Sequence, residues 1–240
     1  MGEISAAAGR HTFAPFRLIR QHFDELAVIL TNSPPSVVAR GDVPFPPDWI
    51  RIWNSAKIRL CTDGAANRLV GLCSDGHLKV PELVVGDFDS ITAETQQYFS
   101  QFPTCELRQV ADQDSTDLSK ALSALMERTC KLSGILLLGG FHGRIDHVLG
   151  ALHVLLLHIQ QVPQVPLFAM DDENVLTVLP EQKPLRLITE GFQWNLNYEI
   201  GYGRTVSSSN CILCPEKVRI QSIGGAVVFT FELREPNRIF

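Results

Sequence analysis

The sequence has no long apolar run, no block of basic residues and no segment resembling a secretory signal. Its longest apolar stretches, such as Ile135–Leu138 and Val154–Leu157, are far too short to cross a bilayer. Met1–Phe16 lacks a basic head followed by an apolar block. With 21 Lys and Arg against 26 Asp and Glu, the net charge is −5, which argues against a surface that binds nucleic acid or an anionic membrane. We therefore expect a soluble protein.

Cysteine is present but forms no recognisable framework. Of the six cysteines, only Cys211 and Cys214 make a C-x-x-C pair, and no second Cys or His pair stands at the spacing of a zinc site. The four histidines between residues 142 and 158 are not spaced to share one helix face, so they do not indicate a metal site either. Unpaired thiols favour a reducing compartment, and we expect a cytoplasmic protein.

From residue 25 onward, short apolar runs alternate with helical stretches. One helix with an apolar stripe of Leu118, Ala121, Leu122, Leu125 and Met126 follows Ser115, and another spans about His147 to Ile159. This alternation predicts an α/β fold, an open and mostly parallel sheet flanked by helices, over residues 25–179, behind a flexible N-terminus at 1–24. The predicted strands are Leu26–Leu30, Ile58–Cys61, Leu83–Val85, Leu107–Val110, Ile135–Leu138 and Val165–Met170.

The pattern changes near residue 180, where Pro180 and Pro184 punctuate the chain and helical periodicity stops. Val218–Ile223 and Ala226–Leu233 flank Gly224-Gly225, which is a two-residue turn signal for a β-hairpin. Residues 180–240 are therefore predicted to form a small all-β, sandwich-like C-terminal domain.

Polar and acidic residues follow most of the predicted strands at the point where each strand ends. These segments are Thr62–Arg68, Gly86–Ser90, Asp112–Asp117, Gly139–His147 and Asp171–Asn174. In an open parallel sheet the carboxyl ends of the strands lie along one edge, which is where such folds bind ligands. The acidic residues are thus expected to converge in space.

Converging carboxylates repel one another and favour a bound cation, and hard oxygen ligands together with phosphates suit Mg²⁺. Asp87 and Asp89 stand at i and i+2, so both can face one ion, and Asp117 in the first turn of a helix can approach from the neighbouring strand. A structural interpretation stays open, because Asp, Asn and Gly are common in turns and because Asp114, Ser115 and Asp117 can cap a helix.

Two further segments allow two interpretations each. The glycines of Gly139-Gly140 let backbone N–H groups approach a phosphate, and Arg144 can add a bidentate contact, but this pattern alone is weak. No Gly-Lys-Ser/Thr and no G-x-G-x-x-G follows a predicted strand, which disfavours a P-loop kinase or a standard NAD dehydrogenase. Trp194 is either a core residue or a platform that stacks on a flat heterocycle, with Ser207–Asn210 supplying hydrogen bonds.

Taken in order, the motifs of this sequence resemble those of the thiamine pyrophosphokinases, the animal-type enzymes above all. The resemblance runs from about residue 26 to the C-terminus and includes four motifs of the catalytic domain and two of the thiamine-binding domain. The matching segments are Asp63–Arg68, Gly86–Ser90, Asp112–Asp117, Gly139–Asp146, Gly191–Leu196 and Val206–Asn210.

The resemblance implies an α/β ATP-binding domain, a β-sandwich thiamine-binding domain and a homodimer whose active sites lie between subunits. It implies transfer of pyrophosphate from ATP to the thiamine hydroxyl, which gives thiamine diphosphate and AMP. In this reaction Mg²⁺ and the phosphates would be held by Asp87, Asp89 and Asp117. The thiamine hydroxyl would be oriented by Asp114 or Asp117. The residues matched to the ATP side are Asp63, Gly64, Asn67, Arg68, Gln113, Thr116, Gly139, Gly140, Arg144 and Asp146. Those matched to the thiamine side are Trp194, Asn195, Ser207, Ser208, Ser209 and Asn210.

The sequence departs from the family pattern in one place. The family normally has a strand pair with a Pro-Gly-containing turn before the Gly-Phe-x-Trp-Asn-Leu motif, whereas here Leu185–Thr189 passes directly into Glu190-Gly191. Loss of a strand pair exposes sheet edges and apolar surface. Two alternatives therefore accompany the main hypothesis: an impaired or non-catalytic nucleotide-binding isoform, and another Mg²⁺-dependent phosphoryl transferase.

Overall fold

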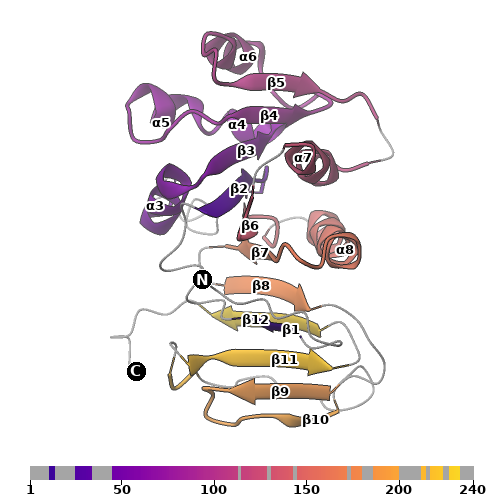
Figure 1. Ribbon diagram of the computed structural model, residues 1–240. Coiled ribbons are helices and arrows are strands. Elements are labelled where there is room, and N and C mark those ends of the chain that lie inside the picture. Colours follow the sequence, from indigo (N-terminus) through magenta and orange to yellow (C-terminus); the bar gives the residue numbers. More distant parts are fainter. Residues whose placement is uncertain are drawn as a thin grey trace.

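The protein consists of a large mixed sheet covered by helices and a smaller antiparallel sheet (Figure 1). The computed structural model describes residues 11–13, 25–33, 45–112, 115–128, 131–142, 145–171, 174–179, 186–199, 212–214, 217–223 and 227–232. Among the helices in these ranges, none is both long and apolar enough to cross a membrane.

The large sheet has eight strands in the order β12-β8-β7-β6-β2-β3-β4-β5. All pairings from β7 to β5 are parallel, and β8 and β12 add antiparallel strands at one edge. The strands are β2 (Leu26–Leu30), β3 (Ile58–Thr62), β4 (Leu83–Gly86), β5 (Glu106–Gln109), β6 (Gly134–Leu138), β7 (Leu167–Met170), β8 (Asn174–Leu179) and β12 (Val227–Glu232). The mostly parallel sheet and its six predicted strands are confirmed, to within two residues at each end.

Helices cover both faces of this sheet, which explains why its central strands are continuously apolar. Alternate residues of a strand point to opposite faces, so that Val28 of β2 joins the core under α3, while Ile29 joins the core under α7 and α8. The helices are α3 (Pro47–Ser55), α4 (Asp63–Ala66), α5 (Val70–Ser74), α6 (Ala93–Ser100), α7 (Asp117–Met126) and α8 (Ile145–Gln161).

Both helices predicted from periodicity are present. The hydroxyl of Thr116 caps α7 by accepting a hydrogen bond from the backbone N–H of Ser119 at 3.2 Å. Four members of the predicted apolar stripe of α7 are buried, whereas Met126 at its end is 38% exposed. The buried stripe fixes the first turn of α7, and with it Asp117, against the sheet.

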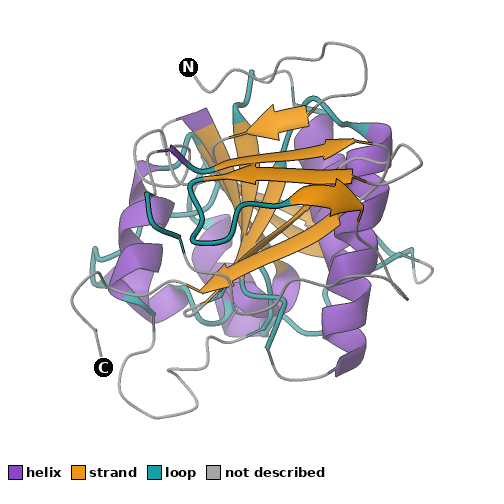
Figure 2. Cartoon of the chain, turned by 90° about the horizontal axis from the view of Figure 1, so that it is seen from below, coloured by secondary structure: helices purple, strands orange, loops and turns teal. Residues whose placement is uncertain are grey.

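The smaller sheet has the strand order β1-β11-β9-β10 and lies at the β8–β12 end of the large sheet (Figures 1 and 2). Its strands are β1 (His11–Phe13), β9 (Arg186–Glu190), β10 (Asn197–Glu199) and β11 (Arg219–Ile223). β10 pairs with β9 alone among the described strands, and all three of its residues are exposed. The shortening of this domain relative to the family pattern stays a prediction.

Two predictions about this region are wrong. β11 and β12 do not form a hairpin, because β11 pairs with β9 and β1 while β12 pairs with β8 of the large sheet. Residues 11–13, placed in a flexible N-terminus by their composition, form a strand paired with β11. In both cases local sequence indicated a turn or a coil, and pairing with strands distant in the chain decided the outcome.

Candidate active site at the carboxyl edge of the sheet

The strand order has a switch point between β2 and β6. From β2 the chain builds β3, β4 and β5 on one side, and from β6 it builds β7 and β8 on the other. Ligands of open α/β sheets bind outside the carboxyl ends of the strands at such a point. The segments after β2, β3, β4 and β6 therefore define the region in which a ligand is expected.

Asp63 organises this edge. It directly follows β3, is 1% exposed, and accepts hydrogen bonds from three backbone N–H groups. Oδ1 accepts from Gly64 at 2.6 Å, and Oδ2 accepts from Phe88 at 3.0 Å and from Ser90 at 3.4 Å. The Asp63 carboxylate therefore fixes the loop after β4, which carries Asp87 and Asp89.

The backbone of this loop is shaped to receive Asp63. A Cβ atom at Gly86 would lie 2.6 Å from the Asp63 Cγ, so only glycine allows this close approach. Phe88 has a φ of 70°, a left-handed conformation that is uncommon for a bulky residue. This conformation accompanies the hydrogen bond from the Phe88 N–H to Asp63.

Asp63, Asp87 and Asp89 form a cluster in which one carboxylate oxygen from each lies within 4.8 Å of the others. Asp63 is buried, Asp87 is half-buried and Asp89 is exposed, so the cluster opens to solvent on one side. Three hard oxygen donors beside an open side fit Mg²⁺, which retains several waters and binds substrate phosphates. The prediction placed Asp63 only on the ATP side, and the structure adds it to the candidate metal ligands.

Asp117 lies next to this cluster but outside the set of three. Its Oδ1 is 3.3 Å from the Nζ of Lys120, and the same Nζ is 3.8 Å from the Oδ2 of Asp87. Burial raises the pKa of Asp117, the nearby Asp63 carboxylate raises it further, and the Lys120 ammonium opposes both. The assignment of Asp117 as a metal ligand stays a prediction.

The side-chain amides of Asn67 and Gln109 form hydrogen bonds with the backbone of the loop after β4. The side chain of Asn67 donates to the Ser90 carbonyl at 2.8 Å and accepts from the Thr92 N–H at 3.0 Å. Gln109 Nε2 donates to the Asp87 carbonyl at 2.8 Å. The structure therefore gives Asn67, predicted to line the ATP side, a direct part in shaping the acidic loop.

The sequence interpretation missed the segment Thr31–Ser33 that follows β2. A Cβ at Gly64 would lie 2.2 Å from the Asn32 Nδ2, and a Cβ at Gly139 would lie 2.6 Å from the Ser33 carbonyl oxygen. The segment therefore packs closely against Gly64, which follows β3, and against Gly139, which follows β6. The signal was present, because Thr31-Asn32-Ser33 is polar and directly follows an apolar strand.

Arg68 points toward this segment and donates to the carbonyl of Thr31. Its Nε and Nη1 are buried and have no hydrogen-bond partner among the described residues, and burial lowers its pKa. Gly139 and Gly140 have φ values of 85° and 99°, a conformation that favours glycine at both positions. The predicted ATP-side residues Gly64, Arg68, Gly139 and Gly140 thus gather at the switch point.

The remaining predicted residues are distributed as follows. Thr116 caps α7, and Asp146 is exposed in the first turn of α8. Trp194 is 57% exposed, so it is no core residue, and Asn195 Oδ1 accepts from the Phe192 N–H at 3.1 Å. Those that lie outside the described residues are Gln113, Asp114, Arg144, Ser207, Ser208, Ser209 and Asn210.

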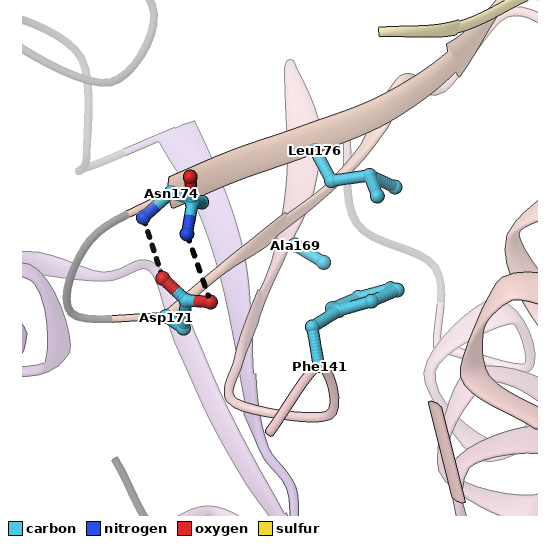
Figure 3. A pocket seen from close by; sticks show the side chains of 5 residues that line it. All are labelled: Phe141, Ala169, Asp171, Asn174 and Leu176. Atoms are coloured by element: carbon cyan, nitrogen blue, oxygen red, sulfur yellow. Dashed lines mark hydrogen bonds between the residues drawn. The ribbon is translucent and has the colours of Figure 1, made fainter. Parts of the chain in front are cut away.

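A pocket of about 200 Å³ lies farther along the same edge, at the ends of β7 and β8 (Figure 3). Phe141, Ala169 and Leu176 form its apolar wall, and the hydrogen-bonded pair of Asp171 and Asn174 lines its polar end. β7 is three strand positions from β3, which corresponds to about 14 Å at the usual strand spacing. The pocket is therefore separate from the acidic cluster.

Burial disfavours a nucleophilic or metal-binding role for Cys61, Cys73 and Cys105. Cys61, Cys73, Cys105 and Cys214 are all unpaired. Burial raises the pKa of Cys73 to about 11 and that of Cys105 to about 12, and it raises the pKa of Cys61 well above its usual value. Thiols held in the protonated form are poor nucleophiles and poor metal ligands.

These features define an α/β protein with a cluster of carboxylates at the carboxyl edge of its sheet. The family model described as "Thiamin pyrophosphokinase, catalytic domain" matches residues 49–166, and "Thiamin pyrophosphokinase, vitamin B1 binding domain" matches residues 161–227. The chain therefore belongs to the thiamin pyrophosphokinase family.

Named relatives agree with this assignment, and a solved structure shows the same fold. The chain is 24% identical to thiamin pyrophosphokinase 1 of Caenorhabditis elegans over 91% of this chain and 93% of the relative. It is 29% identical to thiamine pyrophosphokinase 1 of Arabidopsis thaliana over 71% and 76% of the two chains. Thiamin pyrophosphokinase from Candida albicans has the same fold, with a TM-score of 0.71, 16% identity and coverage of 89% and 91%.

Proposed function

We propose that this protein is a thiamine pyrophosphokinase that transfers pyrophosphate from ATP to the hydroxyl of thiamine and releases AMP. The observation that carries the proposal is the cluster of Asp63, Asp87 and Asp89 at the sheet edge of a chain matched by both domain models of the family. A direct displacement at phosphorus needs positioned reactants and charge neutralisation more than covalent help from the protein.

Each part of the edge has a role in this reaction. Mg²⁺ held by Asp87, Asp89 and Asp117, with Asp63 as a further candidate, would neutralise phosphate charge. Arg68, with donors that the described residues do not satisfy, offsets charge on the departing AMP, and Arg144 is the alternative for this role. Asp117 or Asp114 orients the thiamine hydroxyl for attack on the β-phosphorus.

The thiamine side is proposed to come from a second subunit. Within one chain, the β9–β10 region that carries Trp194 lies at the opposite end of the molecule from β4 and β5 (Figure 1). One chain therefore does not bring Trp194 to its own acidic cluster, and a homodimer with shared sites resolves this separation. The unpaired described cysteines support a reducing, cytoplasmic location.

The decisive test is incubation of the purified protein with Mg²⁺, ATP and thiamine, followed by analysis of the nucleotide product. Release of AMP together with thiamine diphosphate supports the proposal, whereas release of ADP indicates another phosphoryl transferase. Asp87→Asn should lower turnover by about three orders of magnitude, while Asp75→Asn, at an exposed site remote from the cluster, should retain it.

An impaired isoform gives a different pattern. In calorimetry it would bind Mg²⁺·ATP but show neither thiamine binding nor AMP release. Inserting between Thr189 and Gly191 the strand pair that the family resemblance implies should then restore thiamine binding.

A further inference from the structure

Lys120 is a buried charged group for which the proposed function provides no role. Its side chain is 3% exposed, and lysine is almost never buried to this degree unless it is paired. Its ammonium lies 3.3 Å from Asp117 Oδ1 and 3.8 Å from Asp87 Oδ2. Both partners belong to the acidic edge that the proposed reaction uses.

The two contacts of Lys120 join different elements. Asp117 is the first residue of α7, and Lys120 lies one turn later in the same helix, whereas Asp87 directly follows β4. A contact to Asp117 alone would be an ordinary i, i+3 pair of a helix. The additional contact to Asp87 ties the beginning of α7 to the acidic loop, so Lys120 restrains both carboxylates at once.

A divalent cation at this edge and the Lys120 ammonium are attracted by the same carboxylate oxygens and repel each other. We propose that Lys120 is a positioning residue that holds Asp87 and Asp117 in place and also competes with the free cation for them. The inference rests on the proposed function. If Lys120 competes in this way, the free cation binds weakly to the acidic edge. The Mg²⁺·ATP complex binds more readily than the free cation, because the phosphates that accompany the cation favour binding.

The test compares Lys120→Met, which removes the charge and keeps the length, with Lys120→Arg, which keeps the charge. Lys57→Met is the matched control, because Lys57 is exposed at the opposite edge of the sheet, next to the beginning of β3. Mn²⁺ binding is titrated in the absence of ATP, with detection of the free ion by paramagnetic resonance. Turnover is then measured at saturating Mg²⁺ and both substrates.

We expect Lys120→Met to bind Mn²⁺ about tenfold more tightly, because the competing ammonium is absent. We also expect its turnover to fall about 10–100-fold, because Asp87 and Asp117 are no longer held. Lys120→Arg should stay near the wild type in Mn²⁺ affinity, and Lys57→Met in both measurements. A residue that only stabilises the fold would not make Mn²⁺ binding tighter.

Unchanged or weaker Mn²⁺ binding by Lys120→Met, or wild-type turnover, would overturn the inference. If Lys120→Met does not fold, Lys120→Gln, which also removes the charge, is titrated with Mn²⁺ instead and should bind the ion more tightly than the wild type. The Mn²⁺ titration requires neither ATP nor thiamine. Absence of AMP release by the wild type therefore refutes the proposed function, while the titration still decides the role of Lys120.

Discussion

Replacement of Asp63 by asparagine tests whether this buried carboxylate organises the acidic edge. Asparagine keeps only one acceptor oxygen, so its NH₂ group faces either the backbone N–H of Gly64 or those of Phe88 and Ser90, all of which now donate to the Asp63 carboxylate. One or two hydrogen bonds to a charged acceptor are therefore lost, at about 1.5–3 kcal/mol each. Relief of repulsion within the cluster offsets about 1 kcal/mol.

The net destabilisation is therefore about 0.5–5 kcal/mol, which lowers the unfolding midpoint by about 2–15 °C for a chain of this size. Thermal unfolding measures the midpoint, and amide hydrogen exchange should show faster exchange either at Gly64 or at Phe88 and Ser90. Turnover should fall about a hundredfold as Asp87 and Asp89 move. Asp75→Asn is the control, and a midpoint and exchange rates equal to the wild type in Asp63→Asn would refute this account.

Three further predictions concern other parts of the molecule. Gly86→Ala should destabilise the protein and lower turnover, because its Cβ would lie 2.6 Å from the Asp63 Cγ; Gly71→Ala, with open space around it, should do neither. Burial lowers the pKa of His158 below 6.5, so the folded state favours the neutral ring. The free energy of unfolding therefore decreases as the pH falls from 6.5 through the lowered pKa of the folded state. In urea unfolding, His158→Gln should therefore reduce the loss of stability between about pH 7 and 5, and an unchanged pH dependence would contradict this assignment. Trp194→Ala should raise the KM for thiamine and leave the thermal midpoint unchanged, because the side chain is 57% exposed; an unchanged KM would exclude it from the thiamine site.

Predictions from the sequence succeeded where a short sequence pattern reflects the burial or the spacing of the residues within it. Continuously apolar runs such as Leu26–Leu30 predicted strands buried on both faces, and the structure places strands there. The spacing of Asp87 and Asp89 after a strand predicted that their carboxylates lie close together, and the two belong to one cluster; that they share an ion stays a prediction. The family motifs then connected these local signals to a known type of enzyme.

The pairing of strands was decided by tertiary structure. The two runs around Gly224-Gly225 were correctly read as strands, but a turn signal states only that the chain can reverse there. The free energy of pairing with β8 and with β9 determines which sheet each strand joins, and those strands lie about 30 to 50 residues earlier in the chain.

The sequence by itself determined the elements, the acidic character of one sheet edge and the family. Only the tertiary structure decided that Asp63 accepts hydrogen bonds from the loop after β4, that Thr31–Ser33 borders the switch point and that Lys120 reaches two carboxylates. The physical reason is that periodicity encodes whether a side chain is buried. Its partners depend on which strands become neighbours, and that is set by the packing of the whole chain.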